Sequence, residues 1–154
     1  MRQAAAISIA MLMCWSQAFA GAPRWSWNKI RYHGGTVQVK VDPWDWNTTL
    51  VVSQDEIAMT FSPRVAVKIK PSQVRSISYG QEAKRRVEDV VALGVLVGPF
   101  ALFGLLHVSR DELVGIVYDT DDGKRGAVLL QSPLAKQILD KLKDVTGKPI
   151  DINP

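Results

Sequence analysis

Three aspartates in one short stretch, Asp119, Asp121 and Asp122, come closest to forming a metal site. A calcium loop of the EF-hand type needs oxygen ligands at fixed positions and a glutamate at its twelfth position. Counted from Asp119, the sixth position is Lys124 and the twelfth is Leu130. We therefore expect an acidic hairpin turn at this place, with no metal ligands.

The other residues that could do chemistry do not form a recognisable catalytic pattern. His33 and His107 have no second histidine or cysteine at metal-ligand spacing, and no HExxH pattern occurs. Serine, histidine and aspartate are all present, but without a GxSxG elbow or a GxxxxGK phosphate loop. The sequence therefore predicts a protein that is not an enzyme and has no catalytic residues, cofactor or metal. A small hydrolase using Asp42, Asp45 or His33 is the least favoured alternative.

The first 20 residues have the three parts of a secretory signal peptide. Arg2 supplies positive charge, Ala4–Trp15 is apolar, and residues 18–20 (AFA) have the small-x-small pattern of a cleavage site. The single cysteine, Cys14, lies inside this segment, so the mature chain would contain no thiol. A thiol-free chain suits an oxidising compartment. We expect an exported protein of the periplasm or cell envelope.

A second apolar stretch, Val90–Leu106, has 17 consecutive residues without a charged side chain. This is the lower limit of length for a membrane-spanning helix. Gly98 and Pro99 lie near its centre, where proline removes a helical hydrogen bond and favours a reversal. We expect a membrane-associated helical hairpin; a single transmembrane helix and a buried core helix are the alternatives. The expected membrane-inserting residues are Val90, Val91, Leu93, Val95, Leu96, Val97, Gly98, Pro99, Phe100, Leu102, Phe103, Leu105 and Leu106.

Residues suited to a membrane–water interface flank this stretch and also occur near the start of the mature chain. Basic side chains attract anionic headgroups, and tryptophan favours the interface. The mature chain has two tryptophan pairs at i, i+2 spacing, which places each pair on one face of a strand. Packing of the tryptophans on the domain and simple solvation of the cations are the alternatives. The expected interface residues are Lys84, Arg85, Arg86, Trp25, Trp27, Trp44, Trp46 and His107.

Period-two alternation and β-rich runs predict five strands before the apolar stretch, over residues 36–41, 48–53, 56–61, 65–70 and 74–79. After it, a β-rich run and a return strand beyond an acidic turn are expected over residues 112–118 and 125–131. Residues 81–89 are expected to form a helix that leads into the apolar stretch. Ser132 and Pro133 favour the start of a C-terminal amphipathic helix, and Gly147 favours its end. The flank after the stretch is too small to build its own core comfortably, so both flanks should share one domain.

The run Val65–Gly80, VAVKIKPSQVRSISYG, has a strand–proline–strand pattern. With seven strands and a closing helix, it resembles pleckstrin-homology-like (PH-like) or GRAM-like barrels. The apolar Gly-Pro insertion, the DDGK hairpin and the closing TGKP are similar to a group of short exported bacterial proteins without known activity. The resemblance covers residues 35–150. It implies a binding or scaffolding module at lipid or protein surfaces, with no catalytic residues.

The predicted organisation is a mainly β (α+β) chain. Residues 1–20 form a cleaved signal peptide, and residues 21–150 form a single PH-like domain, a seven-stranded barrel with a C-terminal capping helix. Residues 84–107 are an apolar helical insertion in this domain, and 151–154 are a tail. A net charge of +4 is too small to indicate a nucleic-acid binder.

The expected partner is a membrane lipid surface, and a protein of the envelope is the second candidate; no small-molecule substrate is indicated. The expected function is an exported, membrane-associated, non-enzymatic binding or scaffolding module, docked through residues 90–106. A single-pass integral membrane component of an envelope complex is the alternative.

Overall fold

The computed structural model describes residues 21, 23–42, 44–93 and 112–152. The expected signal peptide and residues 94–107 of the expected insertion lie outside this part of the chain. The described residues are mainly β. They form one open eight-stranded sheet in the order β4-β3-β2-β1-β7-β6-β5-β8, antiparallel except for the pairing of β5 with β8. The strands are β1 (Arg24–Gly35), β2 (Thr48–Ser53), β3 (Ile57–Ser62), β4 (Val65–Ile69), β5 (Val74–Tyr79), β6 (Leu113–Asp119), β7 (Arg125–Gln131) and β8 (Ile150–Asp151).

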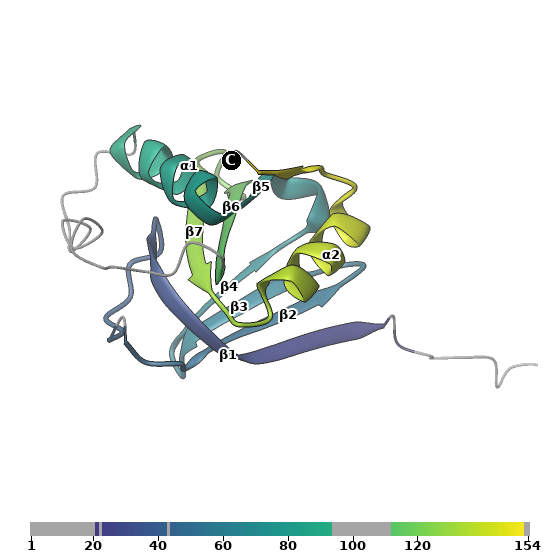
Figure 1. The fold of residues 1–154 in the computed structure, drawn as a ribbon, viewed down its shortest axis with the longest axis horizontal. Coiled ribbons are helices and arrows are strands. Elements are labelled where there is room, and N and C mark those ends of the chain that lie inside the picture. Colours follow the sequence, from purple (N-terminus) through teal and green to yellow (C-terminus); the bar gives the residue numbers. More distant parts are fainter. Residues whose placement is uncertain (1–20, 22, 43, 94–111, 153–154) are drawn as a thin grey trace, which may run out of the picture.

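The long first strand belongs to both halves of the sheet. Its N-terminal half pairs with β2, where Trp27 lies opposite Leu50, and its C-terminal half pairs with β7, where Arg31 lies opposite Gln131. Register shifts after Trp27 and after Tyr32 mark bulges, which bend a strand and increase its twist. The bent sheet therefore has two halves, which face the helix α2 (Ala135–Thr146) (Figure 1).

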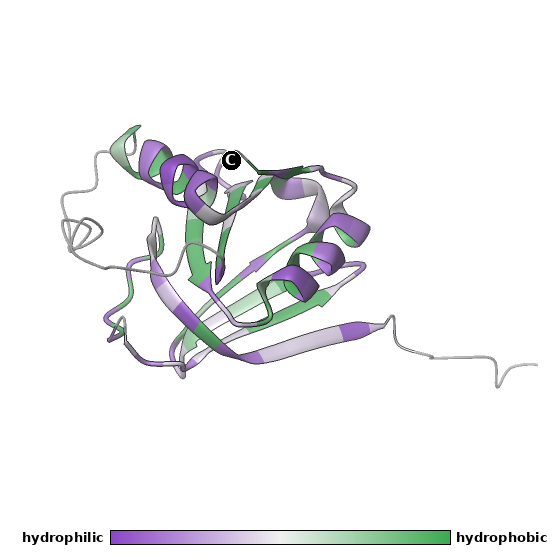
Figure 2. Ribbon diagram, viewed as in Figure 1, coloured by the Kyte–Doolittle hydropathy of each residue, from purple (hydrophilic) through white to green (hydrophobic). Residues whose placement is uncertain are grey.

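The main hydrophobic core lies between the bent sheet and α2. Both halves of the sheet contribute alternate residues to it, because side chains on a strand point to opposite faces in turn. Figure 2 shows apolar strands facing α2 and polar outward faces on the helices. Fully buried core side chains include Ile30, Leu50, Val52, Ile57, Met59, Phe61, Ile77, Ile116, Leu130, Ile138 and Leu142.

The helix α1 (Gly80–Leu93) packs on the opposite face of β6 and β7. A second apolar cluster lies there, formed by Ala83, Val87, Leu113, Val117, Ala127 and Leu129. Gly115 of β6 allows the close approach: a Cβ at this position would lie 2.6 Å from Ser78 Oγ and 3.0 Å from Ala83 Cα. Arg86 of α1 also pairs with Asp151 of β8 at 3.3 Å, which connects the helix to the end of the chain.

Several expected elements are confirmed. β2, β5 and β7 have the predicted bounds, and β3, β4 and β6 differ by one residue at either end. α2 begins at Ala135, later than predicted, because the Ser132 hydroxyl accepts the Leu134 N–H at 3.1 Å in the turn before the helix. Gly147 ends α2 in the left-handed conformation (φ 67°), and its N–H donates to the Lys143 carbonyl.

The prediction of a strand over residues 36–41 is wrong. These residues are irregular, and the first strand is instead β1. The bulges of β1 interrupt its alternation of buried and exposed residues, which hides this strand in the sequence. Val37, Val39 and Val41 do alternate, but their partly buried side chains pack on the main core without joining the sheet. The described sheet thus has eight strands and is open, where seven strands and a closed barrel were expected. A short 3-10 turn, η1 (Pro71–Gln73), separates β4 from β5.

Candidate functional site

The expected insertion connects two neighbouring elements of one packed body. α1 ends at Leu93, and β6 begins at Leu113. β5, which precedes α1, is the antiparallel neighbour of β6, with Tyr79 opposite Val114. α1 itself packs on β6 and β7. The chain therefore enters and leaves residues 94–111 at the same domain.

The described part of the chain exposes five large apolar side chains, and three of them belong to the end of α1 or to the loop between β1 and β2. They are Leu93 (82% exposed), Trp44 (60%) and Trp46 (38%); the other two are Leu134 and Ile152. The C-terminal end of α1 and the loop between β1 and β2, which carries both tryptophans, lie at the same side of the molecule in Figure 1. Thr36, where this loop begins, lines the same pocket as Leu93.

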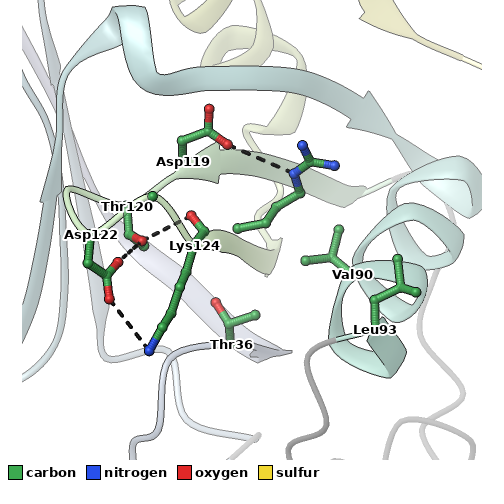
Figure 3. Close-up of a pocket in the computed structure, with 9 residues that line it drawn as sticks. Thr36, Val90, Leu93, Asp119, Thr120, Asp122 and Lys124 are labelled. Carbon is green, nitrogen blue, oxygen red and sulfur yellow. Dashed lines mark hydrogen bonds and ion pairs between the residues drawn. The ribbon is translucent and has the colours of Figure 1, made fainter.

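That pocket lies between the last turns of α1 and the β6–β7 hairpin (Figure 3), and its volume is about 610 Å³. Pockets of this size hold small organic groups. One wall is apolar, from Val90 and Leu93 of α1. The opposite wall is polar and comes from the hairpin. The lining residues are Thr36, Val90, Leu93, Asp119, Thr120, Asp122, Gly123, Lys124 and Arg125.

The polar wall carries charges of both signs. Lys124 Nζ lies 3.6 Å from Asp122 Oδ2, and Arg125 Nε lies 3.9 Å from Asp119 Oδ1. The hydrogen bond from the Thr120 hydroxyl is the main cause that lowers the pKa of Asp122, so this carboxylate stays ionised in mild acid. The cationic side chains are exposed by 82% for Lys124 and 58% for Arg125. Their ion pairs are long and solvated, so they can exchange partners at little cost.

The basic cluster expected at the membrane interface forms intramolecular ion pairs. Arg85 Nη2 and Arg86 Nε both lie 2.8 Å from Glu82 Oε1, and Lys84 Nζ lies 3.8 Å from Glu88 Oε1. The Glu82 side chain is buried, and its pKa is lowered chiefly by the hydrogen bond from Arg85. The arginines thus hold the first turns of α1, while the Arg85 side chain is still 62% exposed.

The two tryptophan pairs lie in different surroundings. Trp25 and Trp27 are half-buried and pack on the main core, and Lys141 Nζ of α2 lies 4.7 Å from the centre of the Trp25 ring. Trp44 and Trp46 are exposed in the loop before β2. The Arg31 guanidinium lies 4.0 Å from the Trp46 ring centre and 5.9 Å from that of Trp44. Of the two pairs, Trp44 and Trp46 are the exposed one, and His107 lies outside the described residues.

A chain of hydrogen bonds connects His33 of β1, through Gln131 of β7, to Glu112, the residue directly before β6. Gln131 Nε2 donates to Glu112 Oε2 at 3.0 Å, so its amide oxygen faces His33 Nε2 at 2.7 Å. Because a carboxylate only accepts, this order fixes Nε2 as the protonated nitrogen of a neutral His33 ring. His33 Nδ1 is buried and has no hydrogen-bond partner within the described chain. Burial is the main cause that lowers the pKa of His33.

Sequence reasoning did not find the two-sided pocket. It assigned Asp119, Asp122 and Gly123 to a turn, which is confirmed for Asp122 and Gly123, whereas Asp119 is the last residue of β6. It assigned the apolar residues of α1 to a membrane segment. Val87, Val90 and Val91 recur at helical spacing, which could have indicated that this end of the helix packs on the sheet. The position of the hairpin opposite that helix depends on the β5–β6 pairing, which no local pattern encodes.

No protein-family model matches the sequence, and no curated protein is significantly similar to it. Among the described residues, no helix has the length and apolar composition needed to cross a membrane. In the same part of the chain, no three histidine, cysteine, aspartate or glutamate side chains come together as a set of metal ligands.

Proposed function

We propose that this chain is an exported, membrane-associated, non-enzymatic binding or scaffolding module of the bacterial envelope, docked through the apolar stretch inserted between α1 and β6. The observation that carries the proposal is the antiparallel pairing of β5 with β6 across an insertion whose sequence is almost wholly apolar. Strands that are hydrogen-bonded neighbours lie on the same side of a membrane. An apolar segment that leaves and rejoins such a pair must return to that side.

This geometry favours a hairpin that dips into one leaflet over the alternative of a single-pass component. A chain that crossed once would leave β5 and β6 on opposite sides of the bilayer. The Gly98–Pro99 break near the centre of the stretch supplies a reversal point. Leu93 exposes an apolar side chain where α1 leads into the stretch, and Trp44 and Trp46 are exposed in the loop between β1 and β2, which suits an interface.

The contacts of α1 narrow the proposed membrane segment. Val90 and Val91 pack against the second apolar cluster, whereas Leu93 projects from the domain. We therefore place the start of the membrane-inserting segment at Leu93, with Val90 and Val91 joining it to the domain. Burial of each methylene group in the acyl region contributes about 0.8 kcal/mol. The large apolar residues of 95–106 therefore contribute more to the free energy of membrane binding than the exposed cations do.

The sheet bent around α2 supports the PH-like assignment as part of this proposal. A C-terminal amphipathic helix packed between two halves of an antiparallel sheet is the arrangement that the resemblance implies. Two features depart from it: the strand β8, and an open sheet in place of a closed barrel.

Vesicle flotation tests the proposal. The mature chain should float with vesicles that contain phosphatidylglycerol, and Leu102→Asp/Phe103→Asp should lower the bound fraction at least about tenfold, because each aspartate at membrane depth costs on the order of 3 kcal/mol. A matched control is Leu134→Asp/Ile152→Asp, which changes two exposed apolar residues outside the proposed contact. Equal flotation of the Leu102/Phe103 variant, or no flotation of the unmodified chain, would overturn the proposal.

A further inference from the structure

The pocket between α1 and the β6–β7 hairpin joins an apolar wall to a rim of paired opposite charges at the root of the insertion. Val90 and Leu93 form the wall, and Leu93 is where the apolar segment begins. If the segment enters a membrane, the pocket lies at the level of the lipid headgroups. Its occupant should then be an amphiphile whose polar end complements the rim.

The charges of the rim determine the class of headgroup. Lys124 and Arg125 can each donate to an anionic oxygen, and Asp122 can accept from a cation. Asp119 already accepts from Arg75 Nε through Oδ2, so only its Oδ1, the partner of Arg125, is available to a second cation. A purely anionic headgroup would satisfy the cations and leave the carboxylates facing like charge. A zwitterionic headgroup satisfies both signs, because its phosphate replaces the carboxylates as partner of the cations while its ammonium takes the carboxylates.

The lining also distinguishes a primary ammonium from a quaternary one. Quaternary ammonium groups are recognised chiefly by cages of aromatic rings. Among the described residues that line the pocket none is aromatic, and they offer instead the carboxylates of Asp119 and Asp122 and the Thr120 hydroxyl. These groups accept hydrogen bonds, which a primary ammonium donates and a choline group does not.

We infer that this pocket binds the zwitterionic headgroup of phosphatidylethanolamine in the membrane surface. The inference rests on the proposed function, since only a docked domain presents the rim to lipids. In the bound arrangement the phosphate accepts hydrogen bonds from Lys124 and Arg125, and the ammonium donates to Asp122 and to Asp119 Oδ1, while Asp119 Oδ2 keeps its ion pair with Arg75. The glycerol end of the lipid packs against Val90 and Leu93. Exposed charges contribute modestly each, so the effect is a lipid preference added to the affinity of the apolar segment.

Two vesicle compositions test the preference. One contains phosphatidylethanolamine with phosphatidylglycerol; in the other, phosphatidylcholine replaces the phosphatidylethanolamine at equal phosphatidylglycerol content. The mature chain should bind the first about three- to tenfold more tightly. Equal binding to the two would overturn the headgroup inference while leaving the proposed function intact. Binding to neither would overturn both.

A charge-neutral double variant separates headgroup recognition from general effects of lipid packing. Asp122→Asn/Lys124→Gln removes one charge of each sign, so attraction to phosphatidylglycerol is unchanged. The matched control is Glu56→Gln/Lys68→Gln, which removes an exposed ion pair of the same 3.6 Å length between β3 and β4. The pocket variant should lose the ethanolamine preference and keep its affinity for the choline vesicles, while the control keeps both. A preference that survives in the pocket variant would overturn the inference.

Discussion

His33 is a buried polar side chain whose hydrogen-bond partners come from distant parts of the chain. His33 is connected to Glu112 only through Gln131, so β1, β7 and the start of β6 each supply one member. This chain of hydrogen bonds leaves the His33 ring neutral with one protonated nitrogen. Protonation of the second nitrogen would place a charge beside the Arg31 guanidinium, which already lowers the pKa of His33 together with burial.

The first prediction concerns acid stability. The pKa of folded His33 lies below that of the unfolded chain, near 6.5. The unfolded state therefore binds more protons below that pH, and the stability contributed by neutral His33 is lost as the pH falls. We expect the Tm to be lower at about pH 5.5 than at about pH 7.5, and His33→Gln to reduce this difference.

Thermal unfolding followed by circular dichroism at both pH values measures the effect. His107 is present in both proteins and cancels in the comparison. The carboxylates with lowered pKa, Glu82 and Asp122, lose their contribution only in stronger acid and do not interfere in this range. The same pH dependence in the two proteins would contradict the assignment of the effect to His33.

At the scale of elements, the strands from β2 to β7 could be predicted from short β-rich runs bounded by turn residues, even where a bulge interrupts the pairing as in β5, whereas β1 could not. β1 carries Trp25, Trp27, Ile30 and Tyr32 toward the core, and the shift between Trp27 and Ile30 breaks the period. The valines of residues 36–41 do alternate, but two glycines with φ of 136° and 149° precede them and end the strand.

The second prediction concerns the contact between α1 and β6. A Cβ on Gly115 would lie 3.0 Å from the backbone of Ala83, so Gly115→Ala should separate helix and strand. We expect the free energy of unfolding to fall by about 1–3 kcal/mol, the usual cost of overpacking a close contact. Urea denaturation measures it. Gly21→Ala, where no atom lies within 4 Å of the added Cβ, should change it by less than about 0.5 kcal/mol. Equal effects at both positions would show that the close approach is not stabilising.

At the scale of the whole molecule, the two-sided pocket arises because the tertiary structure places the end of α1 opposite the β6–β7 hairpin. The sequence predicts the apolar stretch, the hairpin and the closing helix separately. Their placement follows from the β5–β6 pairing and from α1 crossing the outer face of the sheet, where Val87 and Leu129 meet. These contacts join residues far apart in sequence, so local periodicity contains no information on them.

The third prediction concerns membrane topology. The single cysteine, Cys14, lies in the expected signal peptide, so a chain that begins at Gly21 allows single cysteines to be placed on either side of the insertion in sequence. Gln54→Cys and Lys143→Cys are both at exposed positions, before and after it. Both should react with a membrane-impermeant maleimide from the same side of sealed vesicles, to similar extents. Reaction of only one from that side would identify a single-pass protein and contradict the hairpin.

The division of β1 between two partners also sets the order in which the chain can fold. Its N-terminal half needs only β2, which follows within a few tens of residues, so β1 to β4 can assemble before the rest of the chain is available. Its C-terminal half pairs with β7, where Thr36 donates to the Ala127 carbonyl across 91 positions. Closing so long a loop is slow. Until β7 arrives, the edge of β1 that carries Arg31 and His33 is unpaired, and this half-assembled sheet is the state most exposed to aggregation and proteolysis.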